Sequence, residues 1–122
     1  ICTDSATNGG KNHHPRISGS FTRALGKYVR EEKVTTLPDM IRKMTSMPAA
    51  VYGLSGKGLI KEGFDADICI FDFDKIIDRS DYTDSTKKAD GLNYVLVDGE
   101  IVAENAVFNG TKKGKLITIK RR

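Results

Sequence analysis

The run YVLVDGEIV, residues 94–102, constrains the fold of this sequence more than any other stretch. Asp98-Gly99 stands between two runs of alternating apolar residues, and this dipeptide favours a tight hairpin with a type I′ turn. The run ADICIFD at 66–72 predicts another strand. Because its apolar residues fall on both faces, we expect that strand to be covered on both sides. The second half of the chain is therefore predicted to contain an antiparallel sheet.

Weaker signals extend this sheet and interrupt it. Short strands are predicted at Leu59-Ile60, at 106–108 and at 115–119, from their apolar residues. Residues 74–91 are rich in Asp, Ser, Thr and Lys and have little periodicity, which predicts an ordered surface loop. The aspartates of this loop lack the glycine and closing glutamate of a calcium-binding loop, so we interpret them as solvated.

The first half of the chain has helical periodicity instead. Phe21, Leu25, Tyr28 and Val29 follow the spacing i, i+4, i+7, i+8, which predicts a helix from a Ser20 cap to about Glu32. Two shorter helices are then predicted, one capped by Thr36 with Pro38 in its first turn, and one from Ser46 to Gly53. Three methionines, Met40, Met44 and Met47, are interpreted as core residues because they lie at helical spacings.

Composition excludes several kinds of partner. The 122 residues carry a formal charge of +4 that is spread along the chain, without the aromatic platforms or modules of nucleic-acid-binding proteins. No apolar run approaches the roughly 20 residues that span a bilayer, so no membrane partner is expected. Cys2 and Cys69 match no metal or disulfide spacing. We interpret both as small buried residues of a protein in a reducing compartment, which predicts a cytoplasmic location.

Several of these motifs together resemble one enzyme family. The runs GLSGKGLIKEGFDADICIFD and NYVLVDGEIVAENAVFNGTKKGKLI resemble the small β-sandwich that follows the barrel in amidohydrolase-superfamily enzymes. The opening TDS, the triplet HPR at 14–16, the helix SFTRALGKYVREE and the loop DRSDYTDSTKKADGLNYVLVDG more narrowly resemble N-acyl-D-amino-acid deacylases, also called D-aminoacylases. Among the departures from the family pattern, Ala106 stands where glycine is usual and Ser85 where proline is usual.

The resemblance implies a fold and a place within it. Such enzymes have a metal-dependent (β/α)₈ barrel, and the chain would be a C-terminal fragment of α+β class. Residues 1–55 would be the end of the barrel, with a loop and about three helices, and residues 56–122 would be part of the β-sandwich. The parent enzyme would use zinc, with histidine and cysteine ligands on earlier strands, so no cofactor is expected in the fragment.

Two residues are the candidate site residues. Ile1, Cys2 and Thr3 predict the end of a buried strand that runs into Asp4. The resemblance implies that Asp4 is the carboxylate at the end of the eighth barrel strand. There it would act as general base and acid, and it is also a candidate metal ligand. Arg16 would bind the α-carboxylate of the substrate, because a guanidinium offers a planar fork that fits a carboxylate. Without the resemblance, a loop-capping aspartate and a solvated arginine remain the simpler interpretations.

His13 and His14 do not form a predicted metal site. Adjacent residues point in different directions and rarely bind one ion together. We interpret both histidines as structural or solvated.

Three functions remain open at this point. The first is hydrolysis of the amide bond of small-molecule N-acyl-D-amino acids by the parent, with the fragment itself inactive. The second is a cyclic-amide amidohydrolase of the hydantoinase or dihydroorotase type, which need not bind a free carboxylate. The third is a non-catalytic β-sandwich module for binding or structure. Because the helical stripe from Phe21 to Met44 would lose its barrel partners, we expect the fragment to form a homodimer or larger assembly.

Overall fold

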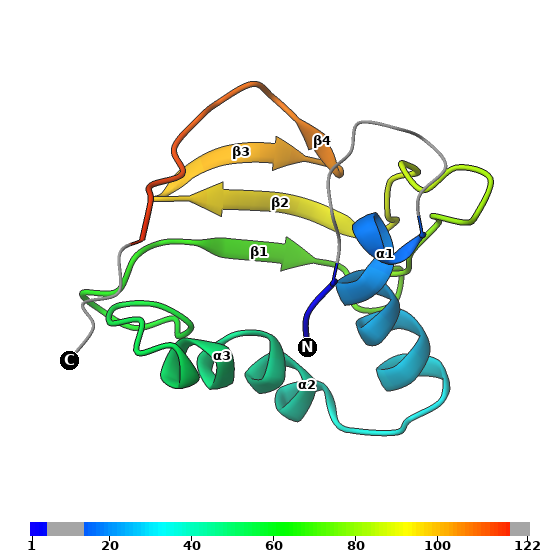
Figure 1. Ribbon diagram of the computed structural model, residues 1–122, viewed down its shortest axis with the longest axis horizontal. Coiled ribbons are helices and arrows are strands. Elements are labelled where there is room, and N and C mark those ends of the chain that lie inside the picture. The colour runs from blue at the N-terminus through cyan, green and yellow to red at the C-terminus, as the bar shows by residue number, and fades with distance from the viewer. Residues whose placement is uncertain (5–13, 118–122) are drawn as a thin grey trace.

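The computed structural model describes residues 1–4 and 14–117 and has an α+β architecture. Its helices are α1 (Arg16–Arg23), α2 (Leu37–Met44) and α3 (Ser46–Val51), with a π-helix, η1 (Ala24–Glu31), continuing directly from α1. The strands are β1 (Ile68–Phe71), β2 (Leu92–Val97), β3 (Glu100–Glu104) and β4 (Val107–Phe108), in the antiparallel order β1-β2-β3-β4. Figure 1 shows α2 and α3 along the β1 side of the sheet, with α1 near the ends of β1 and β2.

The first helix begins earlier than the predicted Ser20 cap. Pro15 is the N-cap of α1, and its fixed φ of −57° suits the start of a helix. The hydroxyl of Ser20 instead lies inside the helix, where it donates to the carbonyl of Arg16 at 2.8 Å. The predicted end near Glu32 is confirmed, because η1 ends at Glu31 and Lys33 adopts a φ of +52°.

The caps of the other two helices follow from their sequences. The side chain of Thr36 accepts a hydrogen bond from the backbone N–H of Asp39, as predicted. Hydrogen bonds from Lys43, Arg42 and Thr35 lower the pKa of the Asp39 carboxyl to about 2. Ser46 is the first residue of α3 and not its cap. The chain then leaves the helix at Gly53, whose φ is +65°.

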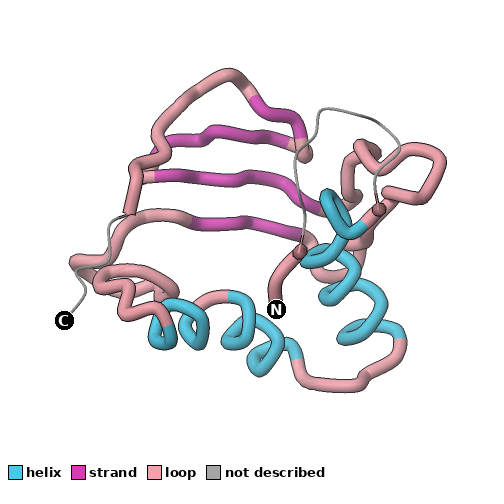
Figure 2. The backbone as a smooth tube through the Cα atoms, in the orientation of Figure 1, coloured by secondary structure: helices cyan, strands magenta, loops and turns pink. Residues whose placement is uncertain are grey.

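The hairpin predicted at Asp98-Gly99 is confirmed (Figure 2). Asp98 and Gly99 both have positive φ, 53° and 79°, as a type I′ turn requires. The strand predicted at 106–108 appears as β4, while Leu59-Ile60 and residues 115–117 form no strand. The remainder of the segment predicted at 115–119 lies outside the described residues.

The prediction that β1 is covered on both sides is wrong. Cys69 and Ile70 are exposed, and β1 lies at an edge of the sheet, paired only with β2 among the described strands. Cys2 is exposed as well, so the interpretation of the two cysteines as buried residues is also wrong. Ile68 and Phe71 at the two ends of the strand are half-buried, and Phe71 packs against the helices, so the cover of β1 is only partial among the described residues.

The core joins the helices to the segment between β1 and β2. Its buried residues are Ala24, Leu25, Val29, Met40 and Ile76, with Leu37, Ile41, Met44, Phe71, Phe73 and Leu92 packed around them. The expectation that the helical stripe lacks cover is therefore largely wrong, because Ile76 and its neighbours cover it. Phe21 and Tyr28 remain about 40 % exposed, and so does Met47, which is not a core residue.

The turn between β3 and β4 offers a test of backbone strain. Asn105 and Ala106 both have positive φ, 49° and 59°. This region costs a residue with a Cβ about 1–2 kcal/mol, and glycine avoids that cost but gives the unfolded chain more freedom. We expect Ala106→Gly to raise the free energy of unfolding by about 0.5–1 kcal/mol, measured by urea denaturation. Ala50→Gly, on the exposed face of α3, is the control and should lower it by up to about 1 kcal/mol. An equal loss of unfolding free energy in both variants would contradict a positive φ at Ala106.

Candidate functional site

Asp4 and Arg16, the two predicted site residues, lie together. A carboxylate oxygen of Asp4 is 3.1 Å from an Nη atom of Arg16, and both side chains are exposed to solvent, by 81 % and 45 %. The backbone of Asp4 has a φ of +47°, a conformation that aspartate tolerates better than most residues. An exposed pair of this kind contributes little to stability, so its significance lies in placing a carboxylate beside a guanidinium.

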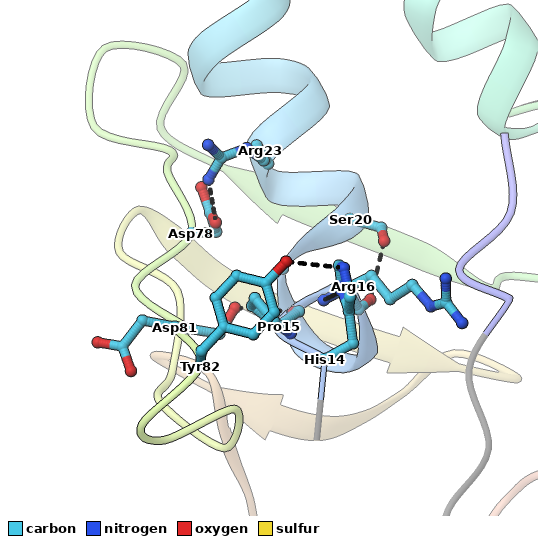
Figure 3. Close-up of a pocket in the computed structure, with 10 residues that line it drawn as sticks. His14, Pro15, Arg16, Ser20, Arg23, Asp78, Asp81 and Tyr82 are labelled. Atoms are coloured by element: carbon cyan, nitrogen blue, oxygen red, sulfur yellow. Dashed lines mark hydrogen bonds and ion pairs between the residues drawn. The ribbon is translucent and has the colours of Figure 1, made fainter. Parts of the chain in front are cut away.

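The backbone of Arg16 is held by His14. Arg16 is the first residue of α1, where backbone N–H groups have no partner within the helix. Its N–H donates to Nδ1 of His14 at 3.1 Å. On the other side of the imidazole, Nε2 lies 3.1 Å from the hydroxyl of Tyr82, and the two rings meet edge to face with centroids 5.2 Å apart (Figure 3).

Tyr82 comes from the loop of residues 78–85, which contacts the start of α1 at several further points. Ser80 donates its hydroxyl to the carbonyl of Pro15 at 2.9 Å. Ser18 donates to the carbonyl of Ser85 at 2.7 Å. Arg23 forms an ion pair of 2.9 Å with Asp78, whose side chain is only 5 % exposed, and this pair raises the pKa of Arg23.

The 78–85 loop is therefore not simply solvated, as we interpreted it from sequence. Ser80 and Ser85 are buried, and the loop approaches Gly19 so closely that a Cβ there would meet Asp78 Cβ at 3.0 Å. Asp81 accepts hydrogen bonds from the backbone N–H groups of Thr83 and Asp84. A hydrogen bond from Lys87 is the main cause that lowers the pKa of Asp81.

A pocket of about 350 Å³ opens between α1 and this loop. Figure 3 shows Tyr82 and His14 meeting on one side of it and Arg23 with Asp78 on another. The pocket is lined by His14, Pro15, Arg16, Gly19, Ser20, Arg23, Asp78, Ser80, Asp81 and Tyr82. Its charged and hydroxyl groups can bind and orient a polar molecule.

The described part of the chain does not form a metal site by itself. Among residues 1–4 and 14–117, no three His, Cys, Asp or Glu side chains lie close enough together to hold an ion. Asp4 could supply one ligand at most, and His13 lies outside the described residues. Within the same ranges no helix is long and apolar enough to cross a membrane.

Sequence reasoning missed Tyr82, Ser80 and Asp78. These residues stand in a polar loop without periodicity, and they lie 55 to 68 positions along the chain from the residues at α1 that they contact. The available signal was the resemblance itself, because the loop DRSDYTDST is one of its narrower motifs.

Comparison with known proteins gives a consistent family. The amidohydrolase family matches residues 2–103 of the chain. The N-acyl-D-glutamate deacylase of Alcaligenes xylosoxydans xylosoxydans is 45 % identical over 86 residues, which are 70 % of this chain and 18 % of that protein. A dihydroorotase of Lactobacillus gasseri is 31 % identical over 120 residues, covering 85 % of this chain and 27 % of that protein.

Solved structures of deacylases share the fold of the chain. The N-acyl-D-glutamate deacylase of Bordetella bronchiseptica, complexed with zinc and a phosphonate mimic of the tetrahedral intermediate, superposes with a TM-score of 0.73. The identity is 39 %, over 77 % of this chain and 21 % of that one. A D-aminoacylase mutant in complex with copper(II) chloride superposes with a TM-score of 0.85 at 33 % identity, over 88 % of this chain and 23 % of that one. The chain thus spans about a fifth of the length of these proteins.

Proposed function

The chain belongs to the amidohydrolase family, and we propose that it forms part of a metal-dependent hydrolase that removes the acyl group from N-acyl-D-amino acids. The observation that carries this proposal is the pairing of Asp4 with Arg16 in a chain that is 45 % identical to an N-acyl-D-glutamate deacylase over 86 residues. The reaction breaks an amide C–N bond and needs a proton acceptor, a proton donor and a group that holds the substrate.

We assign the two parts of the chain to two parts of such an enzyme. Residues 1–55, with all described helices, would form the end of the (β/α)₈ barrel, and residues 56–122 would contribute to the β-sandwich. In this arrangement Asp4 would lie at the C-terminal end of a barrel strand, where catalytic residues of barrel enzymes are found. The strand predicted to run into Asp4 is not formed by residues 1–3 in this structure.

Asp4 would move the proton of the reaction. A bound zinc ion in such hydrolases supplies Lewis acidity, and its ligands would have to come mainly from outside the described residues. The carboxylate of Asp4 would accept a proton from the attacking water and return it to the departing nitrogen. Its exposed position in this structure leaves the carboxylate accessible for that exchange.

Arg16 would bind the α-carboxylate of the substrate. In this structure one Nη atom of the guanidinium lies 3.1 Å from a carboxylate oxygen of Asp4. A substrate carboxylate could be bound by the same guanidinium through both of its oxygens. The match to dihydroorotases keeps a cyclic-amide hydrolase as the second candidate. The two differ in their dependence on Arg16, because a ring-opening enzyme need not bind a free carboxylate.

A pair of chimeras tests the proposal. In the first, this chain replaces its matching segment in the Alcaligenes N-acyl-D-glutamate deacylase, and in the second it replaces that of the Lactobacillus gasseri dihydroorotase. We expect the deacylase chimera to release acetate from N-acetyl-D-glutamate and the dihydroorotase chimera to be inactive. Both should be checked for folding by circular dichroism and for bound zinc. A folded, zinc-loaded deacylase chimera without activity, beside an active dihydroorotase chimera, would contradict the proposal.

The carboxylate role of Arg16 predicts a selective loss of affinity. Arg16→Lys keeps the charge but loses the planar fork, so binding of N-acetyl-D-glutamate to the deacylase chimera should weaken by about 1.5–3 kcal/mol. The analogue whose α-carboxylate is an amide should lose much less. The measurement compares KM for the two substrates in the unaltered and Arg16→Lys chimeras. KM reports affinity here only if turnover is slower than substrate release, which should be confirmed. Equal losses for the two substrates would leave Arg16 with only a structural role.

We also propose that the isolated chain associates with itself through its sheet. Four apolar residues of β1, β3 and β4 are about half exposed: Ile70, Ile101, Val107 and Phe108. Exposed apolar residues and open strand edges favour pairing with a second copy. Sedimentation velocity at micromolar concentration should therefore show a dimer or larger species. Ile101→Lys should shift the distribution toward monomer, and a monomer at all concentrations would refute the proposal.

A further inference from the structure

We propose that His14 and Tyr82 are positioning residues for Arg16, and that the 78–85 loop holds them in place. The inference rests on the proposed function, because it is there that Arg16 binds the substrate. It goes further by naming the groups that fix where Arg16 stands. Neither residue needs to touch the substrate for this role.

The first step is the contact between His14 and the start of α1. The N–H groups of Ile17, Ser18 and Gly19 bond to the carbonyls of His14 and Pro15. The N–H of Arg16 has the imidazole Nδ1 of His14 as its acceptor, at 3.1 Å. His14 thus acts on the first turn as a capping side chain does, and it fixes the backbone from which the guanidinium of Arg16 extends.

The second step is the contact that orients the imidazole. Because Nδ1 accepts a hydrogen bond from Arg16, the proton of the neutral ring lies on Nε2. This N–H then donates to the hydroxyl oxygen of Tyr82, 3.1 Å away. The edge-to-face contact, with 73° between the ring planes, adds a steric limit on rotation of the imidazole. The N–H of Arg16 thus sets the tautomer, and Tyr82 holds the imidazole in the orientation that this hydrogen bond requires.

The third step is the anchoring of the loop that carries Tyr82. Ser80, two residues before it, is buried and donates to the carbonyl of Pro15. Ser85, three residues after it, is buried and accepts from the hydroxyl of Ser18. Tyr82 is thus held between two attachments to the same helix turn that bears Arg16. A bidentate contact with a carboxylate depends on this kind of fixed geometry.

Three variants separate positioning from simple packing. His14→Phe keeps a ring of similar size and removes the acceptor for the N–H of Arg16. His14→Asn removes the ring and restores an acceptor, since an asparagine side chain commonly binds the N–H two residues on. Tyr82→Phe keeps the ring contact and removes the hydroxyl.

Nuclear magnetic resonance on the 122-residue chain tests the positioning without any assay of activity. In the unaltered chain the ¹⁵N shifts of His14 should report a proton on Nε2, and the amide of Arg16 should exchange slowly. Exchange should quicken in His14→Phe and be restored in His14→Asn. Tyr82→Phe should keep the proton on Nε2 and quicken exchange of the Arg16 amide, because the imidazole loses the contact that holds its orientation. A proton on Nδ1 in the unaltered chain, or equal exchange in the Phe and Asn variants, would overturn the inference.

Kinetics in the deacylase chimera test the consequence for substrate. We expect His14→Phe to raise KM for N-acetyl-D-glutamate about 3- to 10-fold, with little change in kcat. His14→Asn should recover most of this loss, and the α-amide substrate should respond to neither variant. Equal losses for both substrates, or losses confined to kcat, would overturn the positioning role. An inactive unaltered chimera would count against the proposed function alone, because the resonance measurements would still decide the positioning.

Discussion

Replacement of Asp4 by Asn in the deacylase chimera is expected to lower kcat by roughly 10²- to 10⁴-fold with little change in KM. Asparagine has nearly the same size as aspartate but cannot accept and return the proton of the reaction. It can still accept a hydrogen bond from Arg16, which lies 3.1 Å from the carboxylate. The change therefore removes proton transfer and keeps most of the local contacts. Steady-state kinetics on N-acetyl-D-glutamate measure the effect.

The matched control is a carboxylate outside the proposed site. Asp74→Asn alters an aspartate in the loop after β1, whose backbone N–H donates a hydrogen bond to the carboxylate of Asp72. This variant should keep kcat within about twofold, since surface substitutions seldom change stability by more than about 0.5 kcal/mol. A near-normal kcat for Asp4→Asn, with zinc content unchanged, would end its assignment as the proton-transferring group.

A second large effect is expected on stability, from Gly26→Ala. Glycine inside a helix ordinarily costs about 0.5–1 kcal/mol relative to alanine, so this change would stabilise an open helix. Here a Cβ at residue 26 would overlap the Ile76 carbonyl oxygen, well inside the sum of their van der Waals radii, and would lie 2.7 Å from Cδ1 of Ile77. We expect Gly26→Ala to lower the free energy of unfolding by about 1–3 kcal/mol or more, because overpacking forces the backbone apart.

Urea denaturation measures the free energy of unfolding of Gly26→Ala, and a second glycine-to-alanine variant at an open position serves as the matched control. A Cβ at Gly114 would meet no atom within 4 Å, so Gly114→Ala should change the free energy of unfolding by less than about 0.5 kcal/mol. The carbonyl of Ile76 also accepts a hydrogen bond from Arg30 at 2.7 Å, and Gly26→Ala would displace that bond. Unchanged or increased stability of Gly26→Ala would show that the π-helix does not lie against residue 76.

Local signals in the sequence were sufficient for the elements whose geometry is set by neighbouring residues. The Asp98-Gly99 turn and the Thr36 cap depend on residues one to three positions apart, and both are present. The start of α1 was misplaced because Ser20 resembles a cap. Pro15 can begin a helix equally well, and its carbonyl is satisfied by Ser20's neighbour Gly19 and by the distant Ser80.

The candidate site also contains residues that local motifs identified and residues that only long-range contacts bring to it. Asp4 and Arg16 were named from short motifs, and their ion pair places them side by side. Tyr82 could not be associated with His14 from periodicity, since the contact joins residues 68 positions apart. The exposure of Cys69 was also missed, because a local apolar pattern does not tell which element covers a strand.

The core shared by η1, α2 and the segment after β1 has a consequence for how related sequences can diverge. Gly26 contacts Ile76 and Ile77, and Arg30 donates to the carbonyls of Phe73 and Ile76. A larger residue at 26 would therefore be tolerated only with a rearranged backbone at 76, so the two positions should vary together among homologues. Recombination at the helix–sheet junction near residue 55 would mix unmatched pairs, whereas exchange of the whole 16–92 unit would keep each pair intact.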